Sequence, residues 1–393
     1  MNVLSLFDGM SCGQIALNCV GVAYNNYYAS EIDKHSIMVT MANYPNTIQL
    51  GSVISVDVGG LEHIDLLIGG SPCQSFSFAG KRNGMSTKCE VEILTLEQYL
   101  DLKRQGFEFE GQSYLFWEYI RVLEAIRLYN PDVKFLLENV MMGEKWQRVL
   151  TKAIGINPIE INSNLVSAQN RRRLYWTNIG AEADGFFGDL VCKIPQPKDK
   201  GLLLKDVLEK DVSEKYYLSD KMLKYLSTAK RAMPNINEET EKARTLIASY
   251  YKTPTDGQYV GAMRGSGGQG DINQQNRIYD INRISPALMA QMSCGTHAIL
   301  DLREAQNIVG NRSEDVLHEP NDKMHTLCSD NGGKVRGRGL FIESKIRRLT
   351  PLECKRLQTV PDDYKMPVSE TQQYKMLGNG WTVDVIKHIF SYL

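Results

Sequence analysis

The first 180 residues alternate short apolar runs with helical patterns, and this alternation restricts the fold more than any other feature of the sequence. Strands are expected at NVLSLF (2–7), NYYASEID (26–33), HIDLLIGG (63–70) and PDVKFLLENV (131–140). Helical apolar spacing lies between them, at GQIALNCVG (13–21) and YLFWEYIRVLEAIRLY (114–129). This rhythm predicts a doubly wound α/β fold with a mostly parallel sheet, in which ligands bind at the carboxyl ends of the strands.

The rest of the chain divides by composition. Between residues 86 and 111 the sequence turns polar and charged, which indicates an insertion with one short helix at LTLEQYLDLKRQ (94–105). From residue 193 to 344 it is rich in Gly, Asn, Gln and Ser, with short β-like runs and turn signals. Compact α/β patterns then return. We therefore expect domain boundaries of 1–192, 193–344 and 345–393, in which the last segment rejoins the first.

Composition also excludes several classes of protein. No run approaches the roughly 18 apolar residues of a membrane span. The N-terminus reaches Asp8 without a basic stretch, so we expect a cytoplasmic protein without a signal peptide. The eight cysteines form no C-x-x-C pair and the six histidines are dispersed, which argues against a disulfide framework and a zinc site. The formal net charge of −1 gives no general attraction for nucleic acid, although basic residues gather at 334–348 and 171–173.

A glycine-containing turn, SLFDGMSCG (5–13), follows the first expected strand and opens the first helix. Glycine there lets backbone N–H groups and the helix N-terminus approach a ligand. Glu31 ends the second strand, where a carboxylate accepts hydrogen bonds from ribose hydroxyls in nucleoside-binding units. The pattern favours a nucleoside cofactor, and a solvated acid at a strand end is the alternative.

Other chemically capable residues fall at or after the ends of later strands. Cys73 follows a proline at the end of the third strand and Glu138 ends the fourth, so both are expected at the same edge of the sheet. Nearby positive charge would activate such a thiol, whereas a cysteine taken alone is more often buried and inert. Arg171 and Arg173 lie in AQNRRRLYW (168–176) and are expected on one side, because side chains alternate along an extended segment.

Six segments in this order resemble the ordered motifs of the DNA (cytosine-5-)-methyltransferase family: FDGMSCG, ASEID, IDLLIGGSPCQSFS, LLENV, AQNRRRLYWTNI and MLGNGWTV. The type is bacterial or phage, with a cofactor turn similar to that of the animal de novo enzymes. The resemblance implies a Rossmann-like catalytic domain at 1–192 with its return at 345–393, and a target-recognition domain at 193–344. It also implies a sequence-specific enzyme that flips a cytosine out of DNA and methylates its C5.

The resemblance assigns roles to the strand-end residues. Cys73 would attack C6 of the cytosine and form a covalent adduct, which puts on C5 the electron density that accepts a methyl group. Glu138 would hold the ring at N3. Arg173, with Arg171 as its neighbour, would contact O2 or order the catalytic loop, which is expected at 74–85. No metal is implied.

The methyl donor implied by the resemblance is S-adenosyl-L-methionine. Its contacts are expected at Phe7 and Gly9 on the methionine side, Glu31 at the ribose, Val53 near the adenine and Asn379 in the closing turn. Where the family usually has an aspartate that reads the adenine amino group, this chain has Ser52. Asp57 and Asp65 are the alternatives, and Asp65, directly before a strand, is expected to be structural.

Double-stranded DNA is the expected partner, read in the major groove by the middle domain. The candidate DNA contacts are Gln74, Ser77, Lys334, Arg336 and Arg338, with the Gly-rich loops 261–270 and 331–339. Two alternatives stay open, a tRNA cytosine-5 methyltransferase of the same family and a catalytically silent DNA-binding subunit. The length of 193–344 favours DNA over tRNA, and the presence of Cys73 and Glu138 argues against the silent subunit.

We expect a monomer. The sequence leaves open its recognition site. It also leaves open whether a cognate restriction enzyme accompanies the protein, or whether it is solitary or phage-borne.

Overall fold

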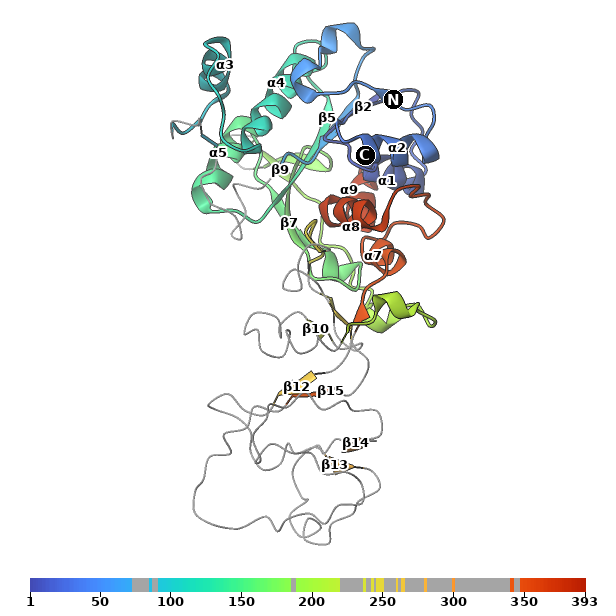
Figure 1. The fold of residues 1–393 in the computed structure, drawn as a ribbon. Coiled ribbons are helices and arrows are strands. Elements are labelled where there is room, and N and C mark those ends of the chain that lie inside the picture. The colour runs from blue at the N-terminus through green and yellow to red at the C-terminus, as the bar shows by residue number, and fades with distance from the viewer. Residues whose placement is uncertain are drawn as a thin grey trace, which may run out of the picture. The chain divides into compact units, whose positions relative to one another are not determined.

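The computed structural model describes residues 1–72, 85–86, 91–184, 189–219, 242–243, 245–250 and 347–393, together with short strands between 236 and 342 (Figure 1). The predicted site residues outside the described residues are Cys73, Gln74, Ser77, Lys334, Arg336 and Arg338. The chain divides into two compact units. Unit 1 comprises Met1–Glu209, Thr240–Lys252 and Thr350–Leu393, and unit 2 comprises Lys210–Glu239 and Thr253–Leu349.

Unit 1 is built on a seven-stranded sheet with the order β3-β2-β1-β4-β5-β7-β6. The strands are β1 (Val3–Leu6), β2 (Tyr27–Ser30), β3 (Ile48–Gln49), β4 (Leu66–Gly69), β5 (Lys134–Val140), β6 (Ile159–Asn162) and β7 (Arg172–Thr177). The pairs from β3 to β5 are parallel, and β7 runs antiparallel to β5 and β6. The predicted doubly wound, mostly parallel sheet is therefore confirmed. The chain order reverses between β1 and β4, which is where such sheets bind ligands.

The central strands are short, and they are buried along their whole length. All four residues of β1, of β2 and of β4 are buried. Strands of this kind read as continuous apolar runs, which is how the sequence revealed them. In the register Leu6 lies opposite Ser30 on one side and Gly69 on the other. The residues that follow β1, β2 and β4 consequently start from one edge of the sheet.

Helices cover the sheet, and some of them were expected from the sequence. They are α1 (Cys12–Val20), α2 (Lys34–Asn43), α3 (Leu96–Arg104), α4 (Phe116–Arg127), α5 (Glu144–Ile154), α7 (Pro351–Leu357), α8 (Glu370–Asn379) and α9 (Val383–Phe390). The helices predicted at 13–21, 94–105 and 114–129 correspond to α1, α3 and α4. Helix α9 packs on α1, and Figure 1 shows the C-terminal helices in red beside the blue α1 and α2. The C-terminal helices thus belong to the same compact unit as the first helix.

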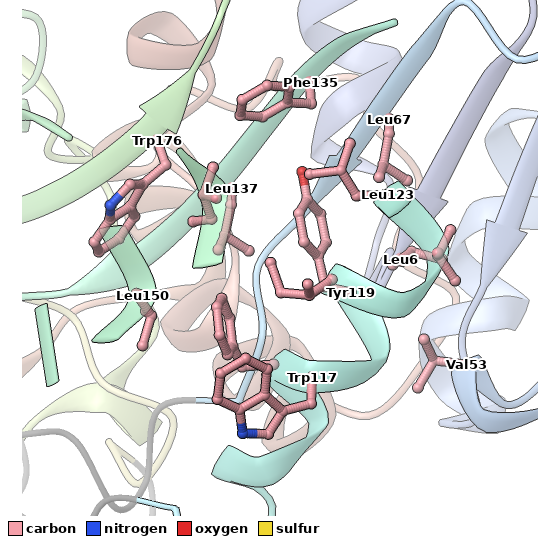
Figure 2. Packing of buried hydrophobic residues seen from close by; sticks show 14 of the residues in the cluster. Leu6, Val53, Leu67, Trp117, Tyr119, Leu123, Phe135, Leu137, Leu150 and Trp176 are labelled. Carbon is pink, nitrogen blue, oxygen red and sulfur yellow. The ribbon is translucent and has the colours of Figure 1, made fainter. Parts of the chain in front are cut away.

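A buried hydrophobic cluster packs α4 against the sheet. Figure 2 shows part of it, with Trp117, Tyr119 and Leu123 of α4 in one cluster with Leu67 and Leu137 of the strands. These five side chains are at most 1% exposed. Removing a large side chain from such a cluster costs about 3–5 kcal/mol. The strands whose ends carry the site are therefore packed against a tightly buried cluster.

The unit boundaries differ from the domain boundaries expected from composition. Residues 193–209 belong to unit 1, because Glu209 N–H donates to Glu353 Oε1 at 2.9 Å and Arg356 donates to Val207 O at 3.2 Å. Segment 240–252 also belongs to unit 1. Packing on unit 1 therefore continues beyond the composition change at 193. An antiparallel hairpin, β8 (Ala181–Asp184) and β9 (Asp189–Cys192), precedes this segment.

Within unit 2 the structure describes short strands. One sheet has the order β10-β11-β16, from Ile236–Asn237, Tyr259–Val260 and Arg347–Arg348. Two further pairs are β12 (Met263–Gly265) with β15 (Leu340–Ile342), and β13 (Tyr279–Asp280) with β14 (Ile299–Leu300). These agree with the short β runs expected there. In the described parts of both units, no helix is long and apolar enough to cross a membrane.

Candidate active site

The turn after β1 has an unusual backbone. Phe7, Gly9 and Ser11 have φ angles of 58°, 59° and 61°, in the left-handed region. Glycine adopts this conformation readily, but Phe and Ser do so at a cost, and such strain is concentrated at functional sites. Gly9 N–H donates to Glu31 Oε2 at 2.8 Å, which joins this turn to the end of β2. Phe7, Gly9 and Glu31, the residues predicted to contact the cofactor, therefore lie close together.

Glu31 is held by the backbone on both of its oxygens. Its Oε1 accepts from Ile32 N–H at 2.7 Å and from Asp33 N–H at 2.8 Å. A carboxylate has about four acceptor sites, so Glu31 keeps capacity for a hydroxyl donor. Ile32 is 73% exposed and offers an apolar surface beside this carboxylate. Sequence reasoning missed Ile32, although an apolar residue directly after a strand-end acid was the available signal.

Asp8 is a second carboxyl group at this turn that sequence reasoning missed. It is buried, and its Oδ1 accepts a hydrogen bond from the Tyr27 hydroxyl at 2.8 Å. Its Oδ2 is also buried and has no hydrogen-bond partner among the described residues. Burial raises the pKa of Asp8 to about 6, and the nearby hydroxyl groups of Ser5, Tyr27 and Ser11 oppose this rise. A buried acceptor without a partner costs stability, which makes Asp8 Oδ2 a candidate for a ligand contact.

The region expected near the adenine is a 3-10 turn, η1 (Val53–Ser55). The side chain of Val53 is only 6% exposed and belongs to the core cluster. Ser52 caps this turn by accepting from Ile54 N–H at 3.4 Å. Asp57 caps the next turn, and Asp65 accepts from Asn2 N–H at 2.7 Å, the structural role expected for it.

The C-terminal turn after α8 lies against the turn after β1. A methyl group added at Gly380 would lie 3.3 Å from Met10 Cε and 3.4 Å from Cys12 Sγ. The Tyr364 hydroxyl, from the segment before α8, donates to Met10 O at 2.6 Å and adds a second contact to the turn after β1. Asn379, the last residue of α8, is exposed and directly precedes Gly380. We call the turn Phe7–Ser11, Glu31 and Asn379 the cofactor side.

Glu138 forms an ion pair at the end of β5. Its Oε1 lies 2.9 Å from Arg173 Nε, and the two side chains are 11% and 13% exposed. A methyl group at Gly70 would lie 3.3 Å from Glu138 Oε2 and 2.9 Å from Trp381 Nε1. The absence of a side chain at Gly70 therefore lets Glu138 and Trp381 converge after β4. Trp381 was not predicted as a site residue.

Asn139, the neighbour of Glu138, holds the chain just before Cys73. Its side-chain amide donates to Ser71 Oγ at 3.0 Å and to Ser71 O at 3.3 Å. Asn139 is 1% exposed, so this contact is shielded from water. The end of β5 consequently fixes the residue two positions before Cys73. We call Glu138, Arg173 and the Gly70–Pro72 segment the base side.

Arg171 has a different environment from Arg173. Its guanidinium donates to three backbone carbonyls, Leu246 O at 2.9 Å, Gly378 O at 3.2 Å and Gly380 O at 3.0 Å. Arg171 is 3% exposed, whereas Arg172 is exposed and pairs with Glu160. The predicted alternation is therefore correct. Arg171 joins the arginine segment to the C-terminal turn and to segment 245–250.

These features define a class of protein. A doubly wound α/β domain carries a glycine turn, a carboxylate after the second strand and a glutamate–arginine pair at the same sheet edge. That combination is typical of an enzyme that uses a nucleoside cofactor. Within the described residues, no group of three or more His, Cys, Asp and Glu is placed to hold a metal ion.

A comparison with known protein families identifies the family of this chain. The family model for C-5 cytosine-specific DNA methylase matches residues 1–97 and 162–393, most of the chain. The chain belongs to this family. The predicted enzyme class, a DNA cytosine-5 methyltransferase, is thereby confirmed. Residues 98–161, which include most of α3, all of α4 and Glu138, lie between the matched stretches.

Individual relatives agree with the family. The chain is 28% identical to the orphan methyltransferase M.SPRI of Bacillus phage SPR, over 100% of this chain and 97% of the relative. It is 25% identical to the type II methyltransferase M.HgiCI of Herpetosiphon aurantiacus, over 97% and 94%. The fold is similar to that of the Entamoeba histolytica methyltransferase EhMeth, with a TM-score of 0.60, 14% identity and coverage of 100% and 97%.

Proposed function

We propose that the protein transfers a methyl group from S-adenosyl-L-methionine to C5 of a cytosine within a specific sequence of double-stranded DNA. Family membership supports the reaction. The observation that carries the assignment to this site is the Glu138–Arg173 pair, held at 2.9 Å beside the Ser71–Pro72 segment that leads to Cys73. Through these contacts a carboxylate able to bind a cytosine ring lies beside the segment that leads to Cys73, the predicted nucleophile.

The cofactor side fits S-adenosyl-L-methionine. Glu31 has acceptor capacity for ribose hydroxyls, and the Oδ2 of Asp8 offers an acceptor to the ammonium group of the methionine part. Phe7 and Gly9 would line that part, and Asn379 would close the pocket. Because the Val53 side chain packs in the core, the backbone of its turn would carry the adenine-side contact. When bound, the cofactor supplies a methyl group on a sulfonium, which a carbon nucleophile can take.

The residues of the base side, together with Cys73, would carry out the reaction on the cytosine. The Cys73 thiolate adds to C6, and the electrons of the C5–C6 double bond move to C5, which takes the methyl group. Loss of the C5 proton to a base and departure of the thiolate then restore the double bond. Glu138 would bind N3, and Arg173 would orient Glu138 and contact O2. Arg171 would act as a positioning residue, because its donors go to carbonyls.

Recognition is assigned to the middle segment. A cytosine inside a duplex is inaccessible, so the target must be flipped out of the stack. We propose that the predicted target-recognition segment 193–344 reads the DNA sequence, with Gln74, Ser77, Lys334, Arg336 and Arg338 at the DNA. The type II name of M.HgiCI favours a restriction–modification setting, and the orphan name of M.SPRI favours a solitary enzyme.

Bisulfite sequencing tests the function directly. DNA is incubated with the purified protein and S-adenosyl-L-methionine and then sequenced, with a parallel reaction on tRNA. Methylation confined to one short DNA motif is the expected result and identifies the target. Methylated tRNA with unmodified DNA would replace DNA by tRNA as the substrate. No transfer to either, with the cofactor bound, would favour the silent subunit.

A further inference from the structure

Glu118 is a carboxylate buried completely within the core, on helix α4. Its side chain has 0% exposure and belongs to neither the base side nor the cofactor side. The Tyr99 hydroxyl donates to its Oε1. Lys103 Nζ lies 2.6 Å from Oε1, and Arg121 Nε lies 2.6 Å from Oε2. A buried carboxylate requires such partners, because an unpaired charge in the core is strongly destabilising.

Arg121 connects Glu118 to η1. Its Nη1 donates to Val56 O at 3.0 Å and its Nη2 donates to Val53 O at 3.0 Å. The guanidinium is a planar fork, so one orientation of the side chain fixes both carbonyls together. The two carbonyls flank the 3-10 turn Val53–Ser55, whose own hydrogen bond runs from Val56 N–H to Val53 O at 3.3 Å.

The other donors to Glu118 come from the polar insertion at 86–111. Tyr99 and Lys103 stand four residues apart on α3 and therefore share one face of that helix. Tyr99 is 1% exposed, and its ring lies 5.1 Å from that of Phe109 between centroids. Burial, and then the neighbouring Glu118, raise the pKa of the Tyr99 hydroxyl, which therefore stays a donor.

We propose that the insertion helix α3 positions the cofactor-binding turn η1, through a relay from Tyr99 and Lys103 to Glu118, from Glu118 to Arg121, and from Arg121 to Val53 and Val56. A buried ionic cluster is seldom more stabilising than apolar packing of the same volume, so its value lies in specifying geometry. The four side chains are positioning residues. The inference rests on the proposed function in one respect, the assignment of η1 to the adenine side.

The first test needs no cofactor. Hydrogen exchange is followed at residues 53–56 in the ligand-free protein, for the wild type and for Lys103→Met and Tyr99→Phe. Exchange of the Val56 amide is expected to quicken by about tenfold in both variants, since the Arg121 fork loses its orientation. Unchanged exchange at 53–56 in both variants, with α3 still folded, would overturn the relay.

The second test measures binding. Isothermal calorimetry with S-adenosyl-L-homocysteine is expected to show affinity about tenfold weaker in Lys103→Met, with restoration in Lys103→Arg. Steady-state kinetics should show the same rise in KM for S-adenosyl-L-methionine, with kcat and KM for DNA within about twofold. Equal affinity in wild type and Lys103→Met would show that the cluster serves stability alone.

Arg127→Met is the matched control. Arg127 lies on the same helix, pairs with Glu124 at 2.7 Å and donates to a carbonyl of α5, Ile154 O at 3.3 Å. Its loss should lower the unfolding midpoint without changing exchange at 53–56 or the affinity for S-adenosyl-L-homocysteine. A wild type that binds no S-adenosyl-L-homocysteine would contradict the proposed function, whereas a wild type that binds it no better than Lys103→Met contradicts only the inference.

Discussion

The base side and the cofactor side lie at the same edge of one sheet, but they satisfy their polar groups differently. On the base side the protein supplies the partners: Arg173 binds Glu138, and Asn139 binds Ser71. On the cofactor side Asp8 Oδ2 is buried without a partner among the described residues, and Ile32 is 73% exposed. The base side is thus preorganised by its own contacts, whereas the cofactor side, where backbone N–H groups hold Glu31, still carries one buried acceptor, Asp8 Oδ2, that a ligand would satisfy.

The largest expected effect separates the two sides. Cys73→Ala should abolish methylation while leaving the affinity for S-adenosyl-L-methionine nearly unchanged, because in the proposed mechanism the thiol acts on the cytosine. Bisulfite sequencing measures the first quantity and calorimetry the second. Retained turnover would rule out the covalent mechanism, and lost cofactor affinity would show that the two sides are not separate.

Glu138→Gln tests whether preorganisation on the base side serves the chemistry. The amide keeps the shape but loses the charge that pairs with Arg173, and it cannot exchange a proton with N3 of the ring. We expect kcat to fall by about 10²- to 10³-fold, with DNA affinity changed by less than about tenfold. Single-turnover kinetics and DNA titrations check both. A larger loss in DNA binding than in kcat would make the role of Glu138 structural.

Arg171→Met probes the contact that joins the base side to the C-terminal turn of the cofactor side. It leaves three carbonyls without their donor, and hydrogen bonds to a charged group contribute about 1.5–3 kcal/mol each, with compensation by water. We expect the free energy of unfolding to fall by about 3 kcal/mol, measured by urea denaturation. Arg172→Met is the control and should leave the unfolding midpoint unchanged, since Arg172 is exposed. An equal midpoint for both variants would contradict a positioning role.

The framework of both sides followed from local sequence pattern. β1, β2, β4 and β5 fall inside the ranges expected for them, because buried strands are short apolar runs bounded by glycine and acids. Helix α2 escaped prediction because its sequence, KHSIMVTMAN, has no apolar stripe. The capping residue Asp33 at its start was the available signal. Helix α5 has buried residues four apart, at Trp146, Leu150 and Ile154, so its signal was present in the sequence.

The site shows where pattern stops being informative. Alternation placed Arg171 and Arg173 on one side, yet their partners differ because these come from distant segments. Arg171 binds carbonyls 75 to 209 residues away in the chain, which only the tertiary fold brings together. For the same reason the sequence does not reveal Asp8. The destabilisation from its buried, unpartnered Oδ2 can be recognised only when its burial and its hydrogen-bond partners are known.

The smallest expected effect concerns Asp8 on the cofactor side. Its pKa of about 6 in the folded protein exceeds the ordinary value of 3.8, so between these pH values the folded state holds a proton that the unfolded state has lost. The contribution of Asp8 to stability therefore declines as pH rises from about 4 to about 6, and stays low above. Asp8→Asn cannot titrate, so its stability relative to the wild type should rise across this window.

Above pH 7, Asp8→Asn should be more stable than the wild type by about 1 kcal/mol, since Asn keeps an acceptor for Tyr27 without a buried charge. Its affinity for S-adenosyl-L-methionine should be about threefold to tenfold weaker, because the ammonium group loses an ionic acceptor. Thermal unfolding at pH 4–8 and calorimetry at pH 8 measure the two. A more stable variant that binds less tightly is the signature of a group retained for its ligand. A variant that gains stability and keeps full affinity would show that the cofactor side, like the base side, is completed by the protein alone.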